Sequence, residues 1–167
     1  MQDTAEPKLL DIQLALLKQE IEVINTAITQ GDEITKNVKQ WAITVWAAAL
    51  GGALTTADLR PFAWATFVLP LVFWLVDASH RVDQRRFIWR NLKIMDFLND
   101  GALERSVVSG RLVDFTLLDI TSRRDRSDGL RTFISWRRVM LFRTLSVLYI
   151  GLALISWLAW ATAQYWK

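Results

Sequence analysis

The sequence predicts an all-α integral membrane protein, and two observations support this fold class. Three apolar spans occupy Trp41–Ala57, Phe62–Val76 and Thr144–Trp166. Fourteen of the twenty Lys/Arg residues lie in one stretch, Asp77–Arg143, between the second and third spans. The predicted segments are a cytoplasmic amphipathic helix (1–40), a transmembrane hairpin (41–76), a basic cytoplasmic helical segment (77–143) and a third transmembrane helix (144–167).

The first segment is expected to be one long helix over residues 8–40 that leads into the first span. A coiled-coil seam with spacings of four and three predicts either self-association or packing on the chain's own second cytoplasmic helix. Gly31 falls on this seam, which predicts a break or kink near Gly31–Asp32. The seam consists of Leu10, Leu14, Leu17, Ile21, Ile24 and Ile28, and Leu9, Ile12, Leu16 and Val23 widen its apolar face.

The first two spans are short and form a tight helical hairpin. Only Asp58, Leu59, Arg60 and Pro61 separate them, and Pro61 suits the first turn of a new helix. A helical hairpin satisfies every backbone hydrogen-bonding group in lipid, as any spanning segment must.

The basic segment is expected to begin with a helix that continues from the second span, over about Ser79–Asn99. Gly101 is suited to a left-handed cap after it. The less regular region Ala102–Ser127 fits short helices or a small hairpin, and we favour helices. Gly129–Arg143 is predicted to be a helix that leads directly into the third span.

The third span has no charged residue in the twenty-three positions from Thr144 to Trp166. At about 1.5 Å per residue it covers a hydrocarbon core of roughly 30 Å. The excess of Lys/Arg places Asp77–Arg143 in the cytoplasm. The N-terminus is then cytoplasmic, and the C-terminus lies on the outer side of the membrane. Met1–Lys8 is polar and lacks the pattern of a cleavable signal peptide.

Composition argues against an enzyme or a metalloprotein. The chain has no cysteine and one histidine, His80, which we expect to be an interfacial residue rather than a catalyst. No spacing supplies carboxylate partners for a histidine metal site. No Gly-rich phosphate loop or nucleophile elbow occurs in the sequence. We therefore expect no catalytic residue, no cofactor and no metal.

One face of the first span carries small, weakly polar residues at spacings of four and three. These residues either let the first span pack closely on the second, with Gly51 and Gly52 at the contact, or line a pore formed by several copies of the chain. A similar face on the third span contains Tyr149, Ser156 and Trp160. The face on the first span consists of Thr44, Ala48, Gly51, Thr55 and Asp58.

The arginines of the basic segment also allow two interpretations. They either set the topology and contact anionic lipid, or they form a binding site for an anionic ligand whose bases stack on aromatic rings. The candidate ligand-binding residues are Arg85, Arg86, Arg123, Arg124, Arg126, Arg131, Trp136, Arg137 and Arg138.

Two stretches resemble a known family. Phe73–Ala78 (FWLVDA) followed by Gln84–Arg90 (QRRFIWR) is similar to the junction in small bacterial membrane proteins of the SLATT type. The resemblance covers about Lys8–Asn99. It implies a two-span hairpin flanked by cytoplasmic helices, in a pore-forming effector of a nucleotide-dependent conflict system. The added third span suggests a relative such as the Hailong type of antiphage effector.

The resemblance and the residue patterns together predict a homo-oligomeric membrane effector in bacterial antiphage defence. It would form an ion-conducting pore gated by a cyclic nucleotide or DNA oligomer that a partner nucleotidyltransferase supplies. The alternative is a non-conducting membrane anchor that recruits a soluble partner through the Leu10–Ile28 helix.

Overall fold

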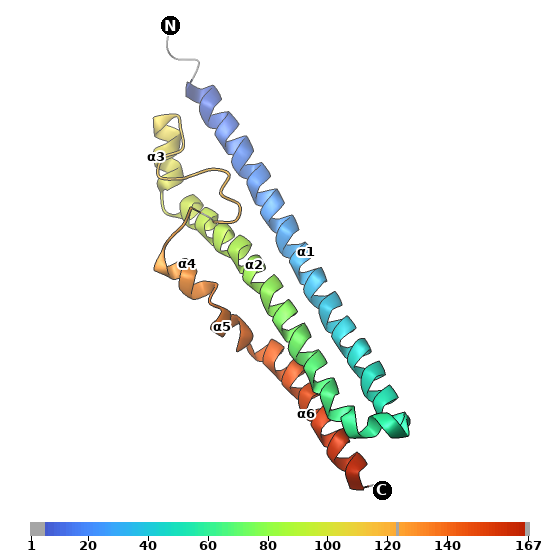
Figure 1. Ribbon diagram of the computed structural model, residues 1–167. Coiled ribbons are helices and arrows are strands. Elements are labelled where there is room, and N and C mark those ends of the chain that lie inside the picture. Colours follow the sequence, from blue (N-terminus) through green and yellow to red (C-terminus); the bar gives the residue numbers. More distant parts are fainter. Residues whose placement is uncertain (1–5, 123, 166–167) are drawn as a thin grey trace. The chain divides into compact units, whose positions relative to one another are not determined.

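The computed structural model describes residues 6–122 and 124–165. These residues form helices and connecting loops and include no strand, which confirms the predicted all-α fold. The elements are α1 (Glu6–Thr55), the 3-10 helix η1 (Ala57–Phe67), α2 (Val68–Asn99), α3 (Ala102–Ser109), α4 (Asp128–Phe133), α5 (Trp136–Met140) and α6 (Arg143–Tyr165) (Figure 1).

The chain divides into two compact units, and each is built from two separate stretches of sequence. Unit 1 comprises Met1–Gln30 and Asp83–Ile134, and unit 2 comprises Gly31–Val82 and Ser135–Lys167. The long helices α1 and α2 therefore each contribute residues to both units. This division differs from the four consecutive segments that the sequence suggests.

Helix α1 runs without interruption through Gly31, so the predicted break near Gly31–Asp32 is wrong. A single glycine inside a helix costs only about 1 kcal/mol relative to alanine, which the rest of a fifty-residue helix outweighs. The boundary between the two units nevertheless falls directly before Gly31.

The connection between α1 and α2 is longer than the predicted four-residue turn. Residues Ala57–Phe67 form the 3-10 helix η1, and Pro61 lies inside it rather than in its first turn. Arg60 Nε donates a hydrogen bond of 2.9 Å to the Leu54 carbonyl. This bond satisfies an acceptor that the end of α1 leaves without a helical partner.

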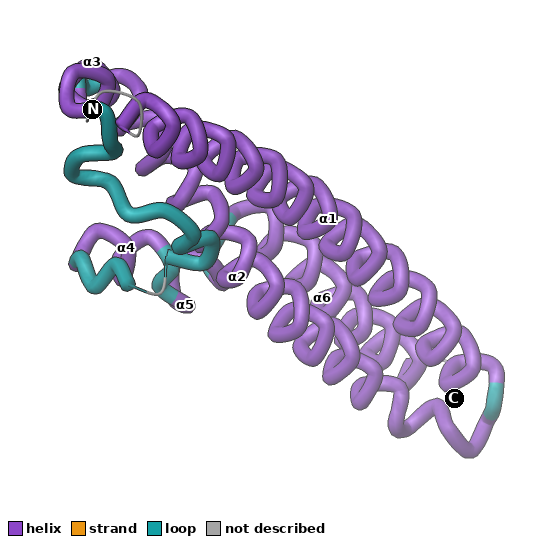
Figure 2. The backbone as a smooth tube through the Cα atoms, turned by 90° about the horizontal axis from the view of Figure 1, so that it is seen from above, coloured by secondary structure: helices purple, strands orange, loops and turns teal. Residues whose placement is uncertain are grey.

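Helix α2 ends at Asn99, as predicted. Gly101 has φ 68° and lies in the left-handed region, where a residue without Cβ meets no steric penalty. Helix α3 follows, so the preference for helical structure after Gly101 is correct for Ala102–Ser109. The next residues up to α4 form the longest loop of the described chain, drawn in teal in Figure 2.

The predicted continuous helix over Gly129–Arg143 is wrong, because the chain forms α4, α5 and the start of α6 there instead. Ser127 caps α4 by accepting a hydrogen bond from the Leu130 amide. The Ser146 hydroxyl donates a bond of 2.9 Å to the Met140 carbonyl at the end of α5. Ser127 thus satisfies a backbone amide at the start of α4, and Ser146 satisfies a backbone carbonyl at the interruption between α5 and α6.

Two helical stretches, Ala57–Asn99 and Asp128–Gln164, are long and apolar enough to cross a membrane, judged by length and composition. They contain the second predicted span and the described part of the third. The first predicted span, Trp41–Ala57, supplies the C-terminal end of α1 and is not one of the two. The small and weakly polar residues Thr44, Gly51 and Thr55 reduce its apolar character.

Each unit has its own hydrophobic core. In unit 1, Leu17 and Ile24 of α1 pack with Ile94 and Phe97 of α2 and with Ala102 of α3. In unit 2, helices α1, α2 and α6 pack together, and Val139 of α5 packs against them. The residues that form this second core are Ala42, Ala78, Val139, Leu145 and Tyr149, with Trp46, Leu50 and Leu152 in an adjoining cluster.

Candidate functional site

A buried ion pair lies at the centre of unit 1. Arg90 Nε of α2 donates a hydrogen bond of 2.8 Å to Glu20 Oε1 of α1, and both side chains are buried. Neither residue was singled out in the sequence as a member of a site. A buried charge of either sign is expensive in free energy unless it is paired and hydrogen-bonded, and each of these groups supplies the other's partner.

The same ion pair fixes the loop between α3 and α4. Arg90 Nη2 donates a hydrogen bond of 2.5 Å to the Thr116 carbonyl, and the guanidinium lies 4.7 Å from the centroid of the Phe115 ring. The second carboxylate oxygen of Glu20 accepts a bond of 2.9 Å from the Leu118 amide. This irregular loop is therefore held by side chains of α1 and α2 in place of a regular backbone ladder.

The loop contains backbone conformations that the ion pair helps to maintain. Asp114, Leu118 and Ser122 have positive φ angles, of 59°, 61° and 50°. Such conformations are unfavourable for residues with a Cβ atom and persist where surrounding contacts impose them. At Leu118, the hydrogen bond from its amide to Glu20 is one such contact.

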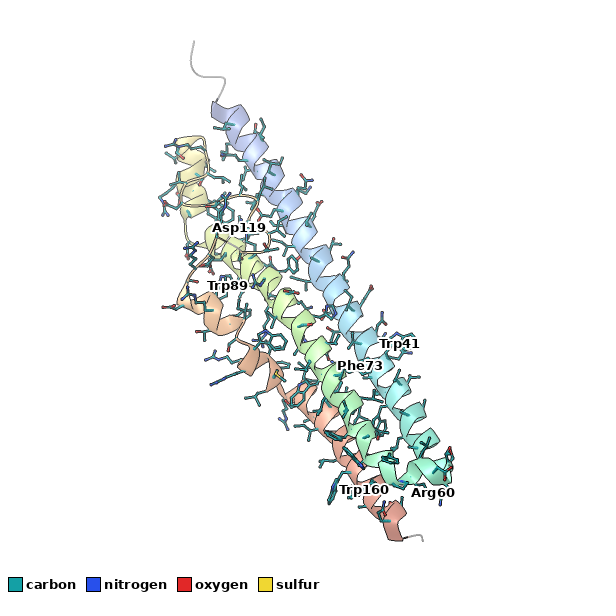
Figure 3. All side chains as sticks on the ribbon, in the orientation of Figure 1. Trp41, Arg60, Phe73, Trp89, Asp119 and Trp160 are labelled. Atoms are coloured by element: carbon teal, nitrogen blue, oxygen red, sulfur yellow. The ribbon has the colours of Figure 1, made fainter. Side chains whose placement is uncertain are left out.

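Beside the ion pair, unit 1 contains a cavity of about 500 Å³. Its lining has charged side chains of both signs, so the electrostatic potential inside the cavity is not uniformly positive. The basic residues that line it are Arg90, Lys93, Arg105 and Arg124, and the acidic ones are Asp96, Asp100, Asp114, Asp119 and Asp125. Figure 3 labels Asp119, which comes from the loop between α3 and α4.

A hydrogen bond between Trp89 and Asp125 ties the last part of this loop to α2. Trp89 Nε1 donates to Asp125 Oδ2 over 2.7 Å, and the Ser127 amide donates to the other oxygen of Asp125. Burial by itself would raise the pKa of Asp125. The hydrogen bonds from Trp89 and Ser127, with the charge of Lys93, outweigh burial and lower the pKa below 3.8.

The predicted ligand-binding arginines of unit 1 are dispersed rather than gathered in one cluster. Arg124 lines the cavity, whereas Arg126 and Arg131 are exposed and Arg131 has an exposed ion pair with Asp128 at 3.8 Å. Arg123 lies outside the described residues.

Two further members of the predicted ligand set, Arg85 and Arg86, lie on α2. The Arg85 Nη1 atom donates to the Phe133 carbonyl over 2.7 Å, and the guanidinium lies 5.2 Å from the Phe133 ring centroid. The Nε atom of Arg86 is buried without a hydrogen-bond partner.

The remaining predicted ligand-binding residues, Trp136, Arg137 and Arg138, belong to α5 in unit 2. All three side chains are exposed.

The predicted oligomerisation seam packs inside unit 1, which is the alternative that the sequence left open. Leu10, Leu17 and Ile24 are buried, and Leu17 and Ile24 contact α2 residues of the core. Ile21 and Ile28 pack against the same core, and Leu14 is half-buried. Self-association through this face would therefore have to displace contacts that the chain makes with itself.

The predicted pore-lining face of α1 is exposed along its whole length. Thr44, Ala48, Gly51, Thr55 and Asp58 are all exposed. A Cβ atom added at Gly51 or Gly52 would meet nothing within 4 Å, so these glycines are not sites of close helix packing. This finding contradicts the close-packing interpretation of the small residues.

Two buried hydrogen bonds inside unit 2 were missed in the sequence. Trp46 Nε1 of α1 donates to Ser156 Oγ of α6 over 2.7 Å, and the Tyr149 hydroxyl of α6 donates to Asp77 Oδ2 of α2 over 3.1 Å. Tyr149 and Ser156 are fully buried, so these two positions of that face of α6 pack within the unit.

Trp160 of α6 and Trp41 of α1 differ in their surroundings. Trp160 donates through Nε1 to the Pro61 carbonyl over 3.1 Å, near Arg60 at the turn that follows α1 (Figure 3). Trp41 is exposed and points away from the helices. Exposed tryptophan on an apolar surface is typical of membrane–water interfaces.

Among the described residues, no group of three or more His, Asp or Glu side chains could hold a metal ion. Comparison with family models, with curated proteins and with solved structures finds no match to this chain. The similarity of Phe73–Ala78 and Gln84–Arg90 to SLATT-type proteins therefore stays a prediction from sequence.

Proposed function

We propose that the chain is a membrane protein that assembles from several identical copies into an ion-conducting pore. The two stretches that could cross a bilayer support insertion. Unit 2 also leaves large apolar side chains exposed: Trp41 is 64% exposed, Phe62 62% and Val147 66%. Such a surface is unfavourable in water and is suited to contact with lipid or with further copies of the chain.

The exposed small-residue face of α1 is the observation that carries the conducting role. A single chain cannot enclose a water-filled path with so few helices, so several copies of α1 must surround it. The hydroxyls of Thr44 and Thr55 donate to carbonyls of their own helix, which leaves their lone pairs to coordinate cations. Asp58 at the end of this face would form a ring of carboxylates that favours cations.

In this proposal an anionic ligand controls the pore from unit 1. The cavity beside Arg124 and Lys93 is the place in unit 1 where a ligand would contact several loop and helix residues at once. Its five aspartates disfavour a ligand that offers only negative charge. A nucleotide fits the mixed lining better, because its phosphates pair with arginine while its base amino groups donate to carboxylates.

The biological setting of the proposal comes from the SLATT-type resemblance. It is bacterial antiphage defence at the inner membrane, with a cytoplasmic N-terminus and a periplasmic C-terminus. The ligand would be a cyclic nucleotide or DNA oligomer, and a nucleotidyltransferase would make it. A near-complete switch requires that the ligand bind one state about 5 kcal/mol more tightly than the other.

Cation flux into liposomes that contain the purified chain tests the proposal. Thr55→Trp places a bulky ring on the proposed lining and should reduce flux at least tenfold. Thr29→Trp is the matched control, because Thr29 is an exposed α1 threonine with the same hydrogen bond to its own helix but belongs to unit 1. Equal flux through both variants would show that the small-residue face of α1 does not line the conducting path.

A second candidate function is a non-conducting anchor that recruits a soluble partner. The outer face of α1 in unit 1 favours it, because Leu9 is 46% exposed, Ile12 58% and Val23 44%. Ile12→Glu together with Val23→Glu should then abolish partner binding. The anchor also predicts that liposomes containing the chain do not pass cations. The pore predicts cation flux when the chain is the only protein present.

A further inference from the structure

The segment around α5 exposes both arginines and large apolar side chains. Leu141, the residue directly after α5, is 75% exposed, and Val139 of α5 is fully buried in the core of unit 2. The segment therefore has an inner face that packs on the protein and an outer face that is exposed. The outer face, here called the α5 collar, consists of Trp136, Arg137, Arg138, Leu141, Phe142 and Arg143.

The positive charge of the α5 collar is not balanced by acids. No Asp or Glu occurs after Asp128 in the whole sequence. None of the ion pairs found in the described part of the chain includes Arg137, Arg138 or Arg143. An anionic partner could therefore approach the collar without displacing an existing ion pair.

An arginine of α2 in the same unit adds an unmet hydrogen-bond donor. The Arg81 guanidinium lies 5.9 Å from the Phe142 ring centroid, and its Nε is buried without a hydrogen-bond partner. Asp77 of the same helix is buried and accepts a hydrogen bond from the Tyr149 hydroxyl. The guanidinium of Arg81 therefore adds a further positive charge beside the collar residue Phe142.

The α5 collar lies within Asp128–Gln164, one of the two stretches that are long and apolar enough to cross a membrane. Helix α6 begins at the last collar residue, Arg143, and extends over 23 residues to Tyr165. Arginine heads beside tryptophan, leucine and phenylalanine side chains suit the level of lipid headgroups, where one end of each residue is solvated and the other meets acyl chains.

We propose that the α5 collar binds the headgroups of anionic phospholipids in the membrane that α6 enters. The proposal rests on the proposed membrane location and is independent of ion conduction. The phosphodiester accepts hydrogen bonds from Arg137 and Arg138, while Trp136, Leu141 and Phe142 contact the upper acyl chains. Each arginine removed should weaken binding about fivefold.

Lipid binding to the full chain in a mild non-ionic detergent tests this proposal. Native mass spectrometry counts bound phosphatidylglycerol and, separately, phosphatidylcholine with the same acyl chains. Arg137→Gln/Arg138→Gln should weaken phosphatidylglycerol binding about 25-fold and leave phosphatidylcholine unchanged. The matched control is Lys18→Gln/Arg111→Gln, which removes the same charge from two exposed basic residues of unit 1 that do not line the cavity. Circular dichroism confirms that both variants retain their helices.

Equal binding of the two lipids, or an equal loss of phosphatidylglycerol binding in the control variant, would overturn the proposal. Two competition results would also overturn it. The third result is displacement of the lipid by inorganic phosphate at the same concentration, and the fourth is displacement by a thymidine oligonucleotide at the same concentration of phosphate groups. The third indicates a site for free phosphate and the fourth a nucleic-acid site. Ion flux measured on the same variants separates this test from the proposed function. Selective lipid binding without any ion flux would support the lipid site at the α5 collar and contradict the proposed pore.

Discussion

Glu20 and Arg90 form a buried ion pair in which Arg90 Nε lies 2.8 Å from Glu20 Oε1. The two residues also hold Thr116 and Leu118 of the loop that leads to the cavity. The pair thus links the packing of α1 and α2 to the conformation of the segment where we propose that a ligand binds. Any ligand-driven change in this loop must keep or break these contacts.

Glu20→Gln should destabilise unit 1 by about 3–5 kcal/mol, because it leaves the buried Arg90 charge without a counter-ion. The loop should open first, so trypsin should cleave after Arg111 much faster than in the unchanged protein. Glu22→Gln is the control, since Glu22 lies two residues after Glu20 in the same helix and its side chain is exposed. Similar cleavage rates for Glu20→Gln and Glu22→Gln would show that the ion pair does not hold the loop.

Asp125 should contribute stability that disappears in acid. Because its folded-state pKa is lowered, the contribution is fully present above the ordinary value of 3.8 and is lost as the pH falls through the lower folded value. The indole N–H resonance of Trp89 should therefore shift with a midpoint below pH 3.8. Asp125→Asn should abolish that transition. A midpoint above 3.8 would contradict the assigned hydrogen bonds.

Gly129 and Gly52 should respond to alanine in opposite directions. A Cβ at Gly129 would lie 3.0 Å from Cη2 of Trp89, so Gly129→Ala should displace the ring and cost about 1–3 kcal/mol. At Gly52 nothing lies within 4 Å, so alanine should stabilise α1 by up to about 1 kcal/mol. Thermal unfolding in detergent measures both. A stabilising Gly129→Ala would mean that Trp89 is free to move.

Ser156→Ala should destabilise unit 2 by about 1–3 kcal/mol, because it leaves Trp46 Nε1 buried without an acceptor. Trp46→Phe in the same background removes the donor as well, so the double variant should lose less than the sum of the two single variants. A double-mutant cycle on unfolding in sodium dodecyl sulfate measures this coupling. Strict additivity would show that the two side chains do not interact.

The sequence predicts the helices better than it predicts which side chains of different helices contact each other. The seam from Leu10 to Ile28 and the uncharged run of α6 are periodic or compositional, so neighbouring residues in the chain reveal them. Glu20 and Arg90 are 70 residues apart, and Trp46 and Ser156 are 110 apart. No local pattern signals such pairs, because each depends on how whole helices pack.

The interruptions between α4, α5 and α6 escaped prediction for a related reason. The composition of Gly129–Arg143 permits a helix, and the hydrogen bond from the Ser146 hydroxyl to the Met140 carbonyl favours an interruption before α6. The arginines were predicted as one ligand set because they are close in sequence. The structure divides them, with Arg124 at the cavity of unit 1 and Arg137 and Arg138 on the collar of unit 2.

Cation flux through liposomes containing only the purified chain tests the central claim most directly. The chain should conduct monovalent cations, and Asp58→Asn should reduce the preference for cations over anions, because it removes the proposed ring of carboxylates. Flux should respond to an added nucleotide ligand only when Arg124 is intact. Liposomes that remain tight with the inserted chain, both without ligand and with cyclic nucleotides or DNA oligomers added, would contradict the pore and favour the anchor.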